Sequence, residues 1–361
     1  MGDAFETVVL PRRVSRQLRL ARLFYRVTWQ PYASVARRMQ DDARREAYLS
    51  YYGPLSLLLL VGIWAVVLIV GFALLQWSAG SALITHNGQS DFGTDLYLSG
   101  TTFFTLGLGD VVPDSQFARV LTVIEAGTGF AFLALVIGYV PIVYQMFARR
   151  ETNVSLLDQR AGSPPSAGEL MRRHVDNADV TLLVELLRDW EIWLGDLLES
   201  HLSYPTLAYF RSQHENQSWV AAVAVMLDLA AYVLACGTTP ATRQAAFTFA
   251  VARHAIGDLT HVLSVRPLSS PNNRLDAAAA ERLWQVARGR GLVTHDPTPA
   301  AGRLMQIRAT YEPYLEALST YLVMPLPPWI PAPRAKDNWE STAWDYDSPI
   351  EVLGPNTPFA R

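Results

Sequence analysis

Two long apolar segments dominate the hydropathy pattern of the chain. Residues 54–76 contain no charged side chain, and residues 120–148 contain a single one, Glu125. A helix rises 1.5 Å per residue, so the first segment spans about 34 Å, and the hydrocarbon core of a bilayer is only roughly 30 Å thick. The sequence therefore predicts two transmembrane helices, at about 54–76 and 120–147.

The rest of the chain has a helical pattern without this apolar continuity. Residues 149–168 are rich in turn residues and are expected to form a linker. Residues 169–324 are expected to form a helical cytosolic domain. Its helices are predicted at roughly 178–201, 219–236, from Thr239 onwards, 275–288 and 300–323. The tail, residues 325–361, has eight prolines and is expected to be disordered or extended.

Residues 219–236 could also be interpreted as a third membrane span. The segment is short for a span, and Asp228 lies near its middle, where a charge is expensive in a bilayer. A buried helix of a soluble bundle is favoured, and a third span, which would place the C-terminus outside, remains the alternative.

The N-terminal arm, residues 1–53, is strongly basic, with ten Arg. On a helical wheel of residues 11–29 one arc carries five of them and the neighbouring arc is apolar. Such a pattern is typical of an interfacial helix, here contacting anionic lipid headgroups through Arg12, Arg16, Arg19, Arg22 and Arg26. Pro31 is expected to end this helix. The alternatives are a helix packed on protein, or a voltage-sensor helix, which would need three preceding spans although only twelve residues precede Arg13.

The distribution of basic residues predicts the orientation of the spans. Residues 77–118 contain no Lys or Arg but have four Asp, whereas Arg149 and Arg150 follow the second span directly. Basic residues stay on the cytoplasmic side, so both termini are predicted to be cytoplasmic, in a multi-pass protein of the cell membrane. Lys336 is the only Lys among 30 basic residues, and this composition suggests a bacterial source.

Few signals of catalysis are present. The single Cys, Cys236, excludes an intrachain disulfide and a Cys-based metal cluster. No glycine-rich nucleotide loop follows a strand pattern. We therefore expect no enzyme activity, no cofactor and no nucleic-acid partner.

A glycine-rich stretch lies between the two spans, in "DLYLSGTTFFTLGLGDVVP" (residues 95–113). After a short helix predicted at 93–104, its backbone suits neither helix nor strand, and such backbone is tolerated at membrane depth only inside protein or along a water-filled path. Gly107 and Gly109 can take positive φ, which would let successive carbonyls coordinate a bare cation. Thr105 could add a hydroxyl ring, and Asp110 suits a hydrated mouth. An ordinary extracellular glycine loop is the alternative, but the helix–loop–helix context favours an ion filter.

The residues "TTFFTLGLGD" and "VVP" resemble the pore loop of the potassium channel family, in its two-transmembrane form, and the resemblance covers about residues 54–148. The resemblance implies that Thr105, Leu106, Gly107, Leu108 and Gly109 form a selectivity filter, with K⁺ held by the carbonyls of the first four. It implies a gating hinge at Gly129, a bend near an inner gate at Pro141, and a cavity lined by Phe130, Leu133 and Ile137, with Pro141 or Tyr144 completing it.

The chain departs from the family pattern at two positions. Leu108 stands where the usual filter has an aromatic residue, which removes a ring and a hydroxyl that brace the filter. Thr101 stands where some bacterial members carry a pore-helix Glu. We hypothesise that Glu125 substitutes for that Glu and supports the filter from behind, near Thr101, Thr102 or Asp110.

The expected fold class is an all-α membrane protein: two transmembrane helices with a re-entrant pore helix and selectivity filter (residues 93–110), plus an α-helical cytosolic domain. One pore loop supplies a quarter of a ring, so a homotetramer is predicted. The predicted function is passive conduction of K⁺, with gating by the cytosolic domain. The alternatives are a non-selective cation channel, a potassium-uptake transporter subunit, and a membrane-anchored sensor.

Overall fold

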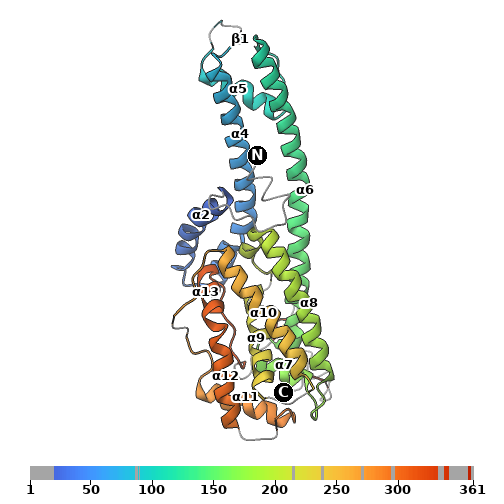
Figure 1. The fold of residues 1–361 in the computed structure, drawn as a ribbon. Helices are drawn as coiled ribbons and strands as arrows, with labels where there is room; N and C mark the ends of the chain where they lie inside the picture. Colours follow the sequence, from blue (N-terminus) through green and yellow to red (C-terminus); the bar gives the residue numbers. More distant parts are fainter. Residues whose placement is uncertain are drawn as a thin grey trace. The chain divides into compact units, whose positions relative to one another are not determined.

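A computed structural model describes residues 20–85, 88, 90–213, 216–236, 240–269, 272–293, 297–331, 337–340 and 357–358. These residues are mostly helical, which confirms the predicted all-α class (Figure 1). The chain divides into two compact units, Met1–Pro31 with Tyr51–Gln145 and Tyr32–Ser50 with Met146–Arg361. Among the described residues, three helical stretches are long and apolar enough to cross a membrane: Asp42–Ser78, Gln116–Ala161 and Trp219–Cys236.

The first unit is built on α4 (Tyr52–Ser78) and the part of α6 (Gln116–Ala161) up to Gln145, with the short α5 (Phe92–Phe103) between them (Figure 1). Buried Gln76 ties the end of α4 to the start of α6, because its amide nitrogen lies 3.3 Å from the carbonyl oxygen of Ala118 and 3.2 Å from the hydroxyl of Thr122. This buried polar contact holds the two helices together at the end where the glycine-rich loop lies.

A small sheet closes the same end of the unit. Strand β1 (Leu83–Thr85) pairs with β2 (Val111–Pro113) in an antiparallel register that sets Ile84 opposite Val112. The sequence did not predict these strands, since each has only three residues. The pairing connects the segment after α4 to the segment that directly follows the glycine-rich loop.

Helix α2 (Leu20–Ala36) corrects the prediction that Pro31 ends the basic helix, because the helix continues through this proline. Aromatic packing on both sides of Pro31 stabilises the helix there. Trp29 contacts Tyr52 at 4.8 Å between ring centroids, and Tyr32 stacks on Tyr48 at 4.2 Å between ring centroids. Of the five arginines assigned to lipid, Arg26 is exposed. Arg12, Arg16, Arg19 and the side chain of Arg22 lie outside the described residues.

The predicted linker at 149–168 is wrong over most of its length. Helix α6 continues to Ala161, and α7 (Ala167–His174) begins after a short turn. The reason is tertiary packing: Val154, Leu157 and Ala161 are buried on one face of the helix, and this burial outweighs the weak local helical preference of the segment.

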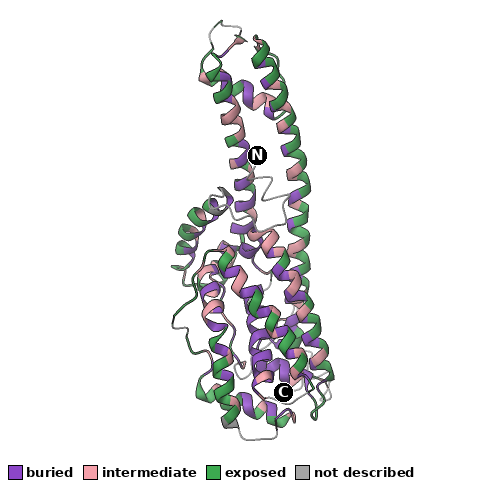
Figure 2. Cartoon of the chain, in the orientation of Figure 1, coloured by how far each residue is buried: buried purple, intermediate pink, exposed green. Residues whose placement is uncertain are grey.

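The second unit is a helical bundle built around α9 (Trp219–Cys236), which is buried along nearly its whole length (Figure 2). Helices α7, α8 (Thr181–Ser203), α10 (Thr242–Val262), α12 (Pro297–Ala309) and α13 (Glu312–Leu322) pack on it. The bundle also contains α3 (Asp42–Ser50), α11 (Ala277–Gly289) and the short helices η1 (Pro205–Tyr209) and η2 (Asn338–Glu340). Its protein neighbours explain the apolar composition of α9 without a membrane.

Asp228 in the middle of α9 is buried and fully paired. Its carboxylate accepts hydrogen bonds from both terminal nitrogens of Arg274, at 2.9 and 2.8 Å, and from the Tyr311 hydroxyl at 2.7 Å. This network also explains why the single helix predicted at 300–323 is two helices. Tyr311 turns inward between α12 and α13, and Pro313 cannot continue an α-helix from the preceding turn.

The tail was expected to be disordered or extended. Its described residues 325–331 are outside helices and strands, but the described parts of the tail are held by packing and ion pairs. Trp329 is buried in the bundle. Asp337 pairs with Arg173 at 2.6 Å and accepts the backbone N–H of Ser163 at 3.2 Å. These contacts fasten the tail to the turn that follows α6. The proline content of the tail indicated that it is not helical, but it could not indicate that Asp337 contacts Arg173 and Ser163.

We expect Asp228→Ala to lower the free energy of unfolding of the bundle by about 3–5 kcal/mol, because it leaves Arg274 buried without its main partner. Thermal or denaturant unfolding of the purified chain measures this. The matched control is Asp176→Ala, which breaks the exposed pair with Arg290 and should cost less than about 1 kcal/mol. Equal effects of the two variants would contradict the assignment.

A buried arginine fixes the protonation state of His201. Arg150 lies in α6 directly after the second predicted span, and it donates to the carbonyls of Leu207 and Phe210, both at 2.8 Å. It also pairs with the Glu151 carboxylate at 2.9 Å and contacts His201 Nε2 at 3.2 Å. Because Arg can only donate, Nε2 accepts and Nδ1 donates to the Leu197 carbonyl at 2.9 Å. Burial and the charge of Arg150 hold the pKa of His201 well below 6.5.

This lowered pKa predicts a loss of stability in acid. Below about pH 6.5, His201 binds a proton in the unfolded chain but stays neutral in the folded chain. The free energy of unfolding therefore falls by up to about 1.4 kcal/mol for each unit that the pH is lowered. His174, whose pKa is also lowered by burial, adds to the effect. Melting temperatures between pH 7.5 and 5 should fall less steeply for His201→Gln than for the parent. His254→Gln, at an exposed site, should keep the parental slope, and equal slopes for all three proteins would refute the prediction.

Candidate functional site

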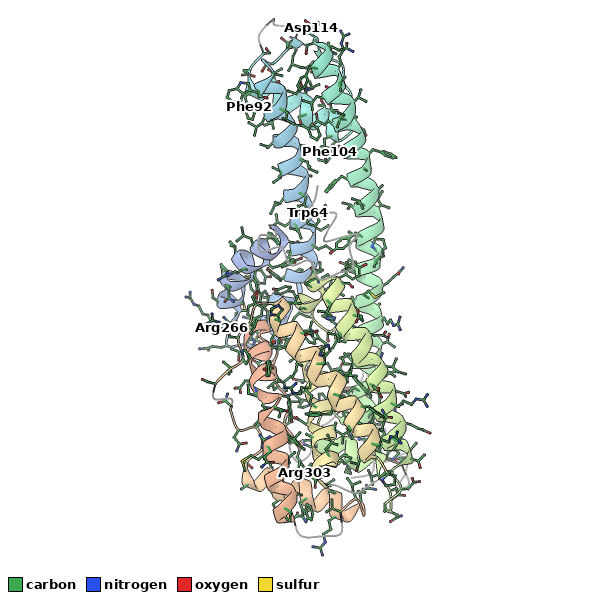
Figure 3. All side chains as sticks on the ribbon, viewed as in Figure 1. Trp64, Phe92, Phe104, Asp114, Arg266 and Arg303 are labelled. Atoms are coloured by element: carbon green, nitrogen blue, oxygen red, sulfur yellow. The ribbon has the colours of Figure 1, made fainter. Side chains whose placement is uncertain are left out.

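The glycine-rich loop follows α5, and local chemistry positions this helix. The Asp91 side chain accepts the Thr94 amide at 2.8 Å, and Thr94 bonds back to Asp91, which forms a capping box. The amides of Phe104 and Thr105 bond to the last carbonyls of α5. The helix at Phe92–Phe103 therefore lies within one residue of the range predicted from the sequence, and Phe104 marks its end (Figure 3).

Residues 105–109 have a backbone suited to coordinating a cation. Gly107 and Gly109 have φ of 56° and 79°, as predicted from their spacing. The amides of Leu106 and Gly107 point back to the Thr101 carbonyl, at 2.8 and 3.5 Å. Among the described residues, none of the carbonyls of 105–109 accepts a hydrogen bond, and all five residues are exposed. With the amide of Thr105, which bonds to the Thr102 carbonyl at 3.0 Å, the loop satisfies three of its donors within the chain and leaves its acceptors free.

Thr105 adds a feature that its sequence context did not indicate. Its φ is 57°, in the left-handed region that a β-branched residue adopts only at a cost of about 1–3 kcal/mol. Thr101, four residues before Thr105, donates its hydroxyl to the Leu98 carbonyl at 3.0 Å, and Thr102 is half-buried. Neither threonine hydroxyl bonds to the loop backbone among the interactions of the described chain.

Asp110 is held by a partner that the sequence did not reveal. The hydroxyl of Tyr97, on α5, donates to its carboxylate at 2.8 Å. This contact braces the Asp110 end of the loop against α5. Leu108 has no hydroxyl that could brace the loop. Tyr97 on α5 provides an aromatic hydroxyl that holds the loop through Asp110. Tyr97 lies thirteen residues before Asp110 in the sequence, so no local pattern indicated that the two side chains would form a hydrogen bond.

Glu125 is buried, as hypothesised, but the prediction of its partner is wrong. Its carboxyl bonds to the Ser99 hydroxyl, and not to Thr101, Thr102 or the region of Asp110. Ser99 also lies 2.8 Å from the Ile69 carbonyl of α4, so one buried hydroxyl joins α4, α5 and α6. Ser99 lies on the face of α5 that contacts α6, whereas Thr101 is two positions away and points elsewhere.

Gly129 lies where α6 touches α5 most closely. A Cβ at this position would lie 2.1 Å from the carbonyl oxygen of Phe103, far inside any real contact. The pairs Ser99–Glu125 and Phe103–Gly129 are each four residues apart on their helices, so α5 and α6 meet at two successive turns. Helix α6 continues unbroken through Gly129 and Pro141. The structure therefore assigns Gly129 a packing role that the family resemblance did not imply.

The predicted cavity residues lie on one exposed face of α6. Phe130, Leu133 and Ile137 are 68%, 53% and 64% exposed in the single chain. Residues of the opposite face, such as Phe132 and Tyr139, are buried. Among the residues that the structure describes, nothing covers this apolar face. Across the described residues, no cluster of three or more His, Cys, Asp or Glu is arranged to hold a metal ion.

Comparison with known proteins supports the interpretation of the first unit. Residues 57–146 match a family model described as an ion channel, which indicates an ion channel domain in this part of the chain. A protein of Bacillus subtilis (strain 168), described as the uncharacterized membrane protein YdjJ, is 26% identical over 181 residues, which cover 49% of this chain and 52% of the relative. The chain thus spans about half the length of this curated relative. No solved structure matches the chain.

We expect Gly129→Ala to abolish ion flux, because the added methyl group must displace α5 and with it the start of the loop. The control is Gly127→Ala, on the same helix with nothing within 4 Å of its Cβ, which should keep parental flux. Flux from reconstituted liposomes compares the two variants. Normal flux in Gly129→Ala would show that the contact with Phe103 does not position the loop.

Proposed function

We propose that the chain is a potassium-selective channel, in which residues 105–109 of four identical chains surround the ion path. The free carbonyls of these five residues are the observation that carries the proposal. A ring of carbonyls can replace the water shell of a cation at little cost. One chain supplies only one such strand, so closure of the ring needs rotational symmetry, and a homotetramer with four pore loops satisfies it. No covalent chemistry is required.

Potassium would be held by the carbonyls of Thr105, Leu106, Gly107 and Leu108, with Gly109 at the outer end. Two contacts support a stiff filter frame: Tyr97 with Asp110, and Ser99 with Glu125. A stiff frame favours an ion of one size, because the carbonyls cannot follow a smaller ion inward. The apolar face with Phe130, Leu133 and Ile137 would line the cavity below the filter.

A non-selective monovalent cation channel is the second candidate. The observation that favours it is Leu108, whose side chain is exposed in the single chain and offers no hydrogen bond to brace the loop. In that case the carbonyls could adjust to Na⁺ as well as K⁺.

The remaining assignments extend the same proposal. Both termini lie in the cytosol and the loop between α4 and α6 lies outside, as the Arg distribution predicts. Helix α2 lies on anionic lipid headgroups: exposed Leu23 and Val27 stand beside exposed Arg26, a pairing suited to a membrane surface.

Gating involves the helical bundle, because α6 continues without interruption from the first unit into the second. Gly129 and Pro141 are the positions where α6 would bend.

We expect liposomes containing the purified chain to conduct K⁺ at least about tenfold faster than Na⁺, which corresponds to about 1.4 kcal/mol of discrimination. Gly107→Ala and Gly109→Ala should abolish flux, since Ala at positive φ is strained and distorts the carbonyl array. Gly80→Ala is the matched control, because Gly80 also has a positive φ of 90° and open space around it.

Each outcome has a distinct consequence. Equal K⁺ and Na⁺ flux in the parent would favour the non-selective channel. An absence of flux in the parent would refute a channel function. Equal losses in Gly80→Ala and Gly107→Ala would show that strain in the outer segment, and not the filter, explains the effect.

A further inference from the structure

The outer face of α8 is acidic. It is made by residues spaced three or four positions apart, which lie on one side of a helix: Leu182, Glu185, Asp189, Ile192, Asp196 and Glu199. Asp196 pairs with Arg149 at 2.6 Å, and within the described chain no ion pair neutralises the other three carboxylates. Arg188 is the basic residue at the edge of this face. The α8 face therefore presents an excess of negative charge to its surroundings.

The outer face of α10 has the opposite charge. Its exposed residues are Arg243, Ala246, Phe247, Ala250, Arg253, His254 and His261 (Figure 2). Arg253 donates to the Thr310 carbonyl at 3.1 Å, which leaves its charge in place, and among the described interactions Arg243 has no acidic partner. Asp258, the acidic residue of this helix, is half-buried and lies 3.4 Å from His254. The α10 face therefore carries positive charge around short alanine side chains, which allow another helix to approach closely.

Each face also carries a large apolar side chain among its charges. Ile192 on α8 is 61% exposed, and Phe247 on α10 is 50% exposed. Protein interfaces combine an apolar centre with a polar rim, and the matching of opposite charges selects the partner. The two faces meet this description as a pair, whereas two copies of the α8 face would repel each other.

The two faces point away from one another within one chain. The helices pack through their opposite sides, where the Thr248 hydroxyl donates to the Leu187 carbonyl at 2.9 Å. Ile192 lies about 140° around α8 from Leu187, and Ala250 lies about 160° around α10 from Thr248. One chain therefore cannot place its α8 face on its own α10 face, and each face is available to a different neighbour.

We infer that the α8 face of one chain docks against the α10 face of the next chain, so that the second units of a tetramer form a closed ring. The inference rests on the proposed homotetrameric channel. Cyclic symmetry joins neighbouring copies through two different surface patches, and the faces of α8 and α10 are two patches of opposite charge on every copy. Helix α6 belongs to both units, so a tetrameric pore tethers four second units, and tethering makes even a weak contact between them effectively intramolecular.

Disulfide cross-linking between two differently tagged full-length chains tests the contact. Both chains carry Cys236→Ser, which removes the single Cys of the sequence. One chain adds Ile192→Cys and the other adds Phe247→Cys. Co-expressed and reconstituted with at most one tetramer per liposome, they should form a mixed-tag dimer on mild oxidation. The matched control replaces Phe247→Cys with Met305→Cys, which is 66% exposed on α12 of the same unit. Its mixed-tag yield should be at least about threefold lower, because it lies outside the docking faces.

Charge reversal tests the electrostatic part of the contact. Arg243→Glu with Arg253→Glu in the Phe247→Cys chain should lower the mixed-tag yield at least about threefold, because like charges then face each other. Adding Glu185→Arg and Asp189→Arg to the Ile192→Cys chain should restore the yield, since the facing charges are opposite again. Rescue by the second reversal distinguishes a direct contact from damage to the fold, and a failure of rescue overturns the inference.

The remaining outcomes separate the ring from the channel itself. K⁺ flux in the parent together with a mixed-tag yield no higher than in the Met305→Cys control overturns the ring while the channel function stands. Equal cross-linking when both chains carry Ile192→Cys also overturns it, because the contact then joins identical faces. An absence of K⁺ flux in the parent refutes the proposed function, and the ring with it.

Discussion

The contact between the α6 backbone at Gly129 and the carbonyl of Phe103 determines where the glycine-rich loop can begin. Because Gly129 lacks a side chain, the two helices approach within a distance that any Cβ would prevent. Four residues earlier, the same helix faces meet through Ser99 and Glu125. These two contacts fix the register of α5 on α6, and Phe103 is the last residue of α5. The loop therefore starts from a backbone position that packing defines, and not from a flexible linker.

The other end of the loop is held by different interactions. Asp110 accepts the hydroxyl of Tyr97, and the following strand β2 pairs with β1. Behind them, Asp95 accepts the Ser81 hydroxyl at 2.6 Å, which ties α5 to the segment that leads into β1. Both ends of the loop are thus attached to the same helix. Its free carbonyls therefore belong to a backbone that is restrained at both ends.

Local signals in the sequence predicted the elements that depend on local chemistry. A near absence of charge marked both predicted spans, since Glu125 is the single charged residue in them, and residues 219–236 are helical with the predicted bounds. The predictions that failed concern packing between distant segments. The helical stretch after Arg150 depends on burial of Leu157, and the ordered tail depends on Arg173 meeting Asp337. In the site, the positive φ of Gly107 and Gly109 could be predicted because these residues lack a Cβ. The contact between Ser99 and Glu125 could not be predicted, because it depends on how α5 and α6 pack together and not on either segment alone.

The prolines inside α2 and α6 share one physical explanation. A proline at position i has no N–H for the carbonyl at i−4, so Pro31 leaves the carbonyl of Val27 without its helical donor, and Pro141 does the same to Ile137. Val27 and Ile137 are 59% and 64% exposed, so both prolines interrupt hydrogen bonding on an accessible face, where water or lipid headgroups can solvate the carbonyl. On the buried face of α6 the same change would strand a polar group among apolar side chains. The positions of the two prolines on exposed faces therefore explain why each helix continues through its proline.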